Sequence, residues 1–107
     1  MSHPPLTNHE LALVRGVFDQ HPHVATVILF GSRAKGTHSS QSDVDLAITG
    51  DVPPLEAEAI TGELDELPLP YRFEVQTLSR MTHRPLRDHI ELAGISIYPA
   101  GSVSRFS

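Results

Sequence analysis

Residues 29–46 contain the side chains whose types and spacing could form a catalytic or ligand-binding site. An apolar run ends in Gly31-Ser32, and such a turn after a strand can offer backbone N–H groups to a phosphate. Asp43 and Asp45 follow after ten intervening residues, at the start of a second apolar run. In a strand these two carboxylates point to the same face, where they repel each other unless a cation lies between them. Because Mg²⁺ prefers hard oxygen ligands together with phosphate oxygens, the stretch predicts a site for a nucleoside triphosphate and magnesium.

Two basic residues inside this stretch, Arg33 and Lys35, are candidate phosphate contacts, although either could equally be a solvated surface charge. Two competing phosphate motifs are excluded. Gly31 and Gly36 have the glycine spacing of a P-loop, but Thr37 stands where a Walker A motif requires lysine. A Rossmann fingerprint is excluded because the sequence contains no Gly-x-Gly.

A third candidate carboxylate, Glu74, lies in a later run of alternating residues. It alternates with Phe73 and Val75, which turns it away from the apolar face of the predicted strand. The alternative interpretation is an ordinary surface residue of a strand. His21 and His23 flank a proline, and two such residues on one loop are weak grounds for a metal site.

The pattern of apolar residues indicates which elements must position these side chains. A T-x-x-E capping box at Thr7–Glu10 precedes a first helix. The nearly continuous β-branched run at 24–30 predicts a strand buried on both faces, whereas alternation over 44–48 predicts a strand with its carboxylates toward a cleft. The predicted elements are helices at about 8–20, 55–67 and from 82 or 83 to 93, one helical turn at 33–35, a polar loop at 37–42, and strands at 24–30, 44–48, 71–76 and 95–98. This order predicts an α/β or α+β domain, with a central mixed β-sheet and helices packed on one side.

Length and composition limit the class of protein. The 107 residues suit a single domain, 1–107, with flexible ends expected at 1–6 and 100–107. The absence of cysteine excludes disulfides and thiolate metal sites. The formal net charge of −5 argues against direct nucleic-acid binding, because surfaces that follow a phosphate backbone are usually basic. The sequence has no signal peptide and no apolar run near the roughly 18 residues of a membrane span, so we expect a cytoplasmic protein without membrane contact.

These residues resemble the nucleotidyltransferase superfamily that includes DNA polymerase beta, and most closely its minimal nucleotidyltransferase (MNT) group from bacteria and archaea. The likeness covers most of the chain, from the loop at 31–36 and the segment 42–46, through the strand with Glu74, to the ending at 88–98. It implies the nucleotidyltransferase fold. It also implies that Gly31 and Ser32 hold the triphosphate, with Arg33 and Lys35 beside them.

The resemblance further implies transfer of AMP from ATP to a hydroxyl with release of pyrophosphate, assisted by two Mg²⁺ ions. Asp43 and Asp45 would bridge the two metal ions. Glu74 would complete the metal site and accept the proton of the attacking hydroxyl. The family usually has aspartate at this position, and glutamate carries the same ligating group on one more methylene.

Family members this short typically pair with a separate helical protein, which leaves three hypotheses for the acceptor. In the first, the chain is an antitoxin that modifies a tyrosine of a partner HEPN-type ribonuclease toxin. In the second, it is the catalytic subunit of a two-protein transferase acting on a small molecule such as an antibiotic. In the third, it is a non-catalytic antitoxin that acts by binding alone.

Overall fold

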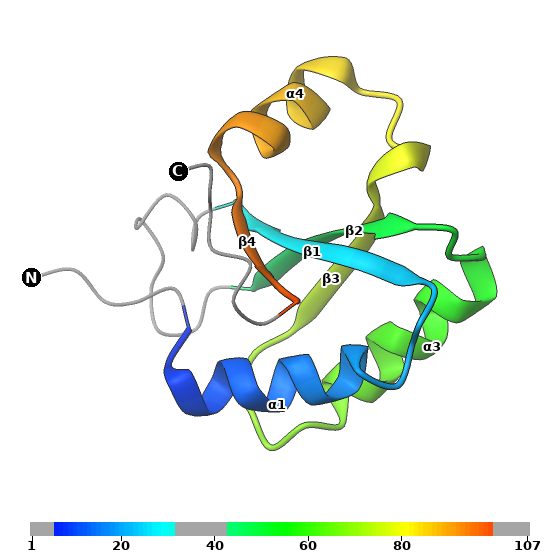
Figure 1. Cartoon of the computed structure of the whole chain (residues 1–107). Helices are drawn as coiled ribbons and strands as arrows, with labels where there is room; N and C mark the ends of the chain where they lie inside the picture. Colours follow the sequence, from blue (N-terminus) through cyan, green and yellow to red (C-terminus); the bar gives the residue numbers. More distant parts are fainter. Residues whose placement is uncertain (1–5, 32–42, 100–107) are drawn as a thin grey trace, which may run out of the picture.

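The computed structural model of the chain describes residues 6–31 and 43–99 as helices on both sides of a four-stranded sheet (Figure 1). In chain order the elements are α1 (Asn8–Phe18), β1 (Val24–Phe30), β2 (Val44–Gly50), α3 (Pro54–Asp65), β3 (Phe73–Thr77), the short 3-10 helix η1 (Leu78–Arg80), α4 (Arg84–Ala93) and β4 (Ile95–Tyr98). The strand order is β3-β2-β1-β4. Strands β2 and β3 pair in parallel, whereas β1 is antiparallel to both of its neighbours. The predicted central mixed sheet is therefore confirmed.

The start of α1 follows from the capping box that the sequence predicts. Thr7 Oγ1 accepts a hydrogen bond from the backbone N–H of Glu10 at 3.1 Å, and Glu10 Oε1 accepts one from the N–H of Thr7 at 2.9 Å. Two N–H groups without helical partners are thereby satisfied at the first turn. The helix ends at Phe18, two residues before the predicted end.

The main core lies between one face of the sheet and the helices α1 and α3. Alternate residues of the two central strands turn to this face, because strand side chains have a period of two. The fully buried side chains of this core include Val27, Leu29, Leu46 and Ile48 from the strands, and Val14, Phe18, Ile60 and Leu64 from the helices. These two helices lie on one side of the sheet, as the sequence predicts.

The third helix, α4, differs because it packs against the opposite face (Figure 1). Its Ile90 joins a second, smaller apolar cluster with Phe30 and Ala47, and Leu86 packs at the margin. The reason lies in β1, whose apolar residues point both ways. Its second apolar face must also be shielded from water, and α4 packs over it.

Within residues 6–31 and 43–99, no helix combines the length and apolar character needed to cross a bilayer.

Candidate active site

Three acidic side chains are brought together where β2 begins. Asp45 pairs in register with Glu74 of β3 on one side and with Phe30 of β1 on the other. Val44 turns to the core, so the exposed Asp43 and the half-buried Asp45 turn to the opposite face. The backbone fixes this register, since the N–H of Val44 donates to the carbonyl of Arg72, the residue before β3, at 2.9 Å.

Gly31 lies directly against this group of carboxylates. Its backbone has a φ of +81°, a conformation that residues with a side chain rarely adopt. A Cβ placed on Gly31 would overlap Oδ2 of Asp45. The positive φ therefore favours glycine at the turn after β1, and a side chain at this position would push the Asp45 carboxylate aside. The other predicted nucleotide-binding residues, Ser32, Arg33 and Lys35, lie outside the described residues.

The electrostatics of the site reflect this crowding. Burial raises the pKa of Asp45 above its ordinary value, and the nearby charges of Glu74 and Asp43 raise it further. Both of these neighbours are exposed at the same face. Carboxylates held this close repel one another, and a bound cation would relieve the repulsion.

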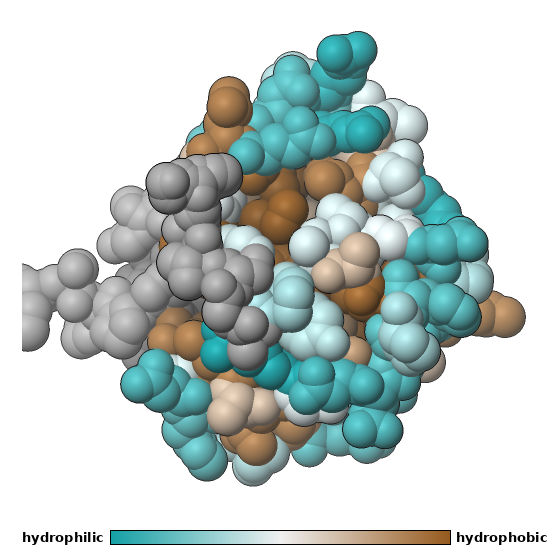
Figure 2. Space-filling view, viewed as in Figure 1, coloured by the Kyte–Doolittle hydropathy of each residue, from teal (hydrophilic) through white to brown (hydrophobic). Residues whose placement is uncertain are grey.

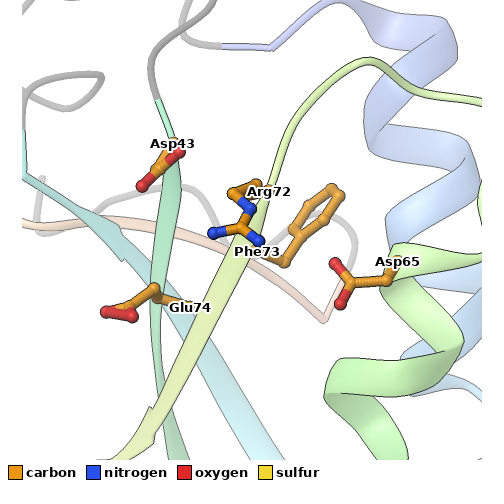
Figure 3. A pocket seen from close by; sticks show the side chains of 5 residues that line it. All are labelled: Asp43, Asp65, Arg72, Phe73 and Glu74. Atoms are coloured by element: carbon orange, nitrogen blue, oxygen red, sulfur yellow. The ribbon is translucent and has the colours of Figure 1, made fainter.

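A shallow pocket of about 310 Å³ opens beside the carboxylates. Figure 3 shows Asp43 and Glu74 pointing to the same side of the β2–β3 pair, while Phe73 turns toward Asp65 of α3. Arg72 completes the lining. Arg72 was not among the site residues predicted from the sequence. Its position two residues before Glu74 could have identified it, because residues at this spacing in a strand lie on the same face.

The chemistry of these donors fits a hard cation. All three candidate ligands are carboxylates, which suit Mg²⁺ and not the softer transition metals. Among the residues that the structure describes, no three His, Cys, Asp or Glu side chains already form a metal-binding group. Asp45 and Glu74 are neighbours on two paired strands, and Asp43 directly precedes the first of these strands.

The two histidines of the loop before β1 lie elsewhere. His21 and His23 hydrogen-bond to carboxylates of α3, at the end of β1 opposite to Gly31. His21 Nδ1 and Nε2 lie 2.9 Å from oxygens of Glu56 and Glu63, and His23 Nδ1 lies 2.8 Å from Glu56. These contacts have hydrogen-bond lengths, so the group joins the loop to α3 and is separate from the carboxylate site.

Comparison with known proteins gives one family and several structural neighbours. The model of the family described as "Polymerase beta, Nucleotidyltransferase" matches residues 14–101. A direct search of curated proteins gives no match.

Three solved structures share the fold at low sequence identity. A crystal structure of a toxin–antitoxin with AMP-PNP has a TM-score of 0.70 at 19% identity, covering 82% of this chain and 72% of that chain. A mutant of the toxin–antitoxin MntA–HpeT has a TM-score of 0.66 at 15% identity, covering 83% and 71%. A protein from Sulfolobus solfataricus described as a nucleotidyltransferase has a TM-score of 0.53 at 14% identity, covering 92% and 88%.

Proposed function

Since the chain belongs to the polymerase beta nucleotidyltransferase family, we propose that it transfers AMP from ATP to a tyrosine hydroxyl of a partner HEPN-type toxin, and so acts as an antitoxin. The observation that carries this proposal is the meeting of Asp43, Asp45 and Glu74 beside Gly31. Paired strands hold the acidic face next to the turn that would receive a triphosphate. This arrangement is the one needed to place a nucleotide and its cation together.

In this proposal the three carboxylates would hold two Mg²⁺ ions, which when bound would neutralise charge on the triphosphate and lower the pKa of the acceptor hydroxyl. Asp45 lies on β2 and Asp43 directly precedes that strand, so both would keep the reactive phosphate near the end of β1. Glu74, exposed on the neighbouring strand, accepts the proton of the attacking hydroxyl. Ser32, Arg33 and Lys35 follow Gly31 in the sequence and are proposed to contact the phosphates.

Arg72 is a further candidate for substrate binding. It is exposed in the same pocket as Asp43 and Glu74, and its guanidinium can donate to phosphate oxygens. An arginine beside three carboxylates also offsets part of the negative charge that a triphosphate must approach.

A protein acceptor is supported by two observations. The first is that two of the structural neighbours are toxin–antitoxin structures, one of them containing AMP-PNP. The MntA–HpeT mutant replaces two aspartates, two positions apart, with glutamates, the same spacing as Asp43 and Asp45. The second is that the pocket is open to solvent and that four of its five lining side chains are exposed, all but the buried Phe73. An acceptor hydroxyl must be held about 3–3.5 Å from the phosphorus, and a second chain is the simplest supplier of that constraint.

The test is to co-express the chain with the product of the neighbouring reading frame, incubate the pair with ATP and Mg²⁺, and record intact masses. We expect the partner to gain one or more AMP units on tyrosine while its ribonuclease activity falls. Asp43→Asn with Asp45→Asn should abolish the gain, and Glu74→Gln should slow it by about 10²-fold or more. Glu74→Asp, which restores the residue usual in the family, should keep or raise the rate.

Asp51→Asn is the matched control, because Asp51 is an exposed carboxylate just beyond the opposite end of β2. It should leave transfer unchanged. An unmodified partner together with AMP transfer to a small molecule would favour the two-protein antibiotic-type transferase instead. A partner that is inhibited on binding but never modified would favour the non-catalytic antitoxin.

A further inference from the structure

The outer face of α4 carries a short charged stripe, in which two basic residues are followed by two acidic residues. Arg84, Arg87, Asp88 and Glu91 recur at i, i+3, i+4 and i+7, which places them along one side of the helix. They line a depression of about 280 Å³, and all but the half-buried Arg87 are exposed. Figure 2 shows hydrophilic side chains over this outer surface, while Ile90 on the other side packs toward the sheet.

The order of these charges does not favour the isolated helix. A helix dipole is stabilised by acidic residues in the first turn and basic residues in the last. In α4 the first turn has no acidic residue, the last turn has no basic one, and no side chain caps the N-terminus. The ion pair within the stripe, from Arg87 Nε to Glu91 Oε2, is 3.8 Å long, and an arginine that precedes the acidic residue is the weaker orientation.

The same order is complementary to itself in the antiparallel direction. If a second α4 lies antiparallel about a two-fold axis between positions 87 and 88, Arg84 faces Glu91 of the other copy. Arg87 then faces Asp88, and symmetry repeats both pairs. The two helix dipoles also oppose one another in this arrangement. A parallel arrangement would instead place arginine against arginine.

We propose that this charged stripe of α4 is a self-association surface, through which two copies of the chain pair as an antiparallel helix dimer. The exposed Leu92, 88% accessible and one turn beyond Asp88, adds apolar area at each end of the contact. A helix of ten residues is about 15 Å long, so the interface lies at the small end of specific contacts. The dimer is therefore weak and depends on charge complementarity. This proposal does not rest on the proposed transferase function.

Charge exchange on the full chain tests the proposal by sedimentation velocity over a wide range of concentrations. Arg84→Glu with Arg87→Glu makes the stripe wholly acidic, and Asp88→Arg with Glu91→Arg makes it wholly basic. Each change improves the match with the helix dipole, which offsets the lost Arg87–Glu91 pair and the new like-charge neighbours, so we expect both variants to keep the wild-type fold. Circular dichroism checks this.

We expect the wild type to dimerise and each variant alone to lose at least about tenfold in dimer affinity, because like charges then face each other. An equimolar mixture of the acidic and basic variants should form a heterodimer with at least the wild-type affinity. The matched control, with Glu58→Arg at an exposed position of α3 and Glu66→Arg at the exposed C-cap of that helix, should dimerise like wild type. A wild type that stays monomeric, variants that dimerise unchanged, or a mixture that forms no heterodimer would each overturn the proposal.

Discussion

His21 provides a pH-dependent contribution to stability whose sign and size follow from its contacts. Its Nδ1 lies 2.9 Å from Glu56 and its Nε2 lies 2.9 Å from Glu63. Ionised carboxylates only accept hydrogen bonds, so both contacts are satisfied only when the imidazole carries two protons. The charged ring then joins the loop before β1 to α3.

The direction of the pH effect follows from the pKa of His21. Burial alone lowers this pKa, but the hydrogen bonds to Glu63 and Glu56 outweigh burial and raise it above 6.5. The folded chain therefore binds this proton more tightly than the unfolded chain. The stabilisation is fully present below pH 6.5, the unfolded value, and is lost as the pH rises through the higher folded value. At the acidic end, the hydrogen bonds from His23 and His21 lower the pKa of Glu56 below 4.5, so the Glu56 carboxylate stays ionised down to that region.

The magnitude can be worked from the same contacts. A neutral imidazole donates from one nitrogen only, so raising the pH removes one charge-assisted hydrogen bond. Such a bond contributes about 1.5–3 kcal/mol. The side chain of His21 is only 12% exposed, but that of Glu63 is 44% exposed, which places the loss nearer to about 1 kcal/mol. For a domain of this size we expect a fall in Tm of roughly 5 °C.

The assay is thermal and urea unfolding of wild type and His21→Gln at a series of pH values. The series runs from about 5.5 to about 8.5, that is, from about one unit below to about two units above the ordinary histidine pKa. We expect the wild type to lose stability with rising pH and His21→Gln to show a flatter profile. His89→Gln, at an exposed position on α4, is the matched control and should retain the wild-type slope. Equal slopes in wild type and His21→Gln would refute the argument, as would an NMR titration of His21 with a midpoint below the unfolded value.

Two further substitutions test the site and the packing. Gly31→Ala should abolish Mg²⁺-dependent nucleotide binding, measured by calorimetry, because the added Cβ displaces Asp45, whereas Gly16→Ala in α1, where a Cβ meets open space, should keep it. Retained binding in Gly31→Ala would contradict the close approach. Tyr71→Phe should destabilise the fold by about 1 kcal/mol in urea titrations, because it removes the 2.6 Å hydrogen bond from Tyr71 Oη to Glu10. Tyr98→Phe removes an exposed 3.2 Å hydrogen bond from Tyr98 Oη to Asp19 and should lower the free energy of unfolding by less than about 0.5 kcal/mol. Equal losses in the two tyrosine variants would contradict the larger contribution expected of the Tyr71–Glu10 hydrogen bond.

The sequence alone predicted most of the local elements and the faces of the strands that carry the acidic residues, but not the side of the sheet on which α4 packs. Thr7 and Glu10 predicted the start of α1 because a capping box uses only neighbouring residues. Alternation over 44–48 was enough to place Asp43 and Asp45 on one face, since the period of a strand does not depend on which strand it pairs with. The alternation around Glu74 likewise turned that carboxylate away from the core.

Tertiary structure alone decided which of these faces meet. The pairing of Asp45 with Glu74 depends on β3 lying parallel beside β2, and strand order follows from the packing of the whole core. The contact of Gly31 with Asp45 depends in the same way on the register between β1 and β2. Local sequence patterns carry no information on which segments become neighbours, because periodicity and propensity are properties of one segment. A functional site instead joins several segments that lie far apart in the chain.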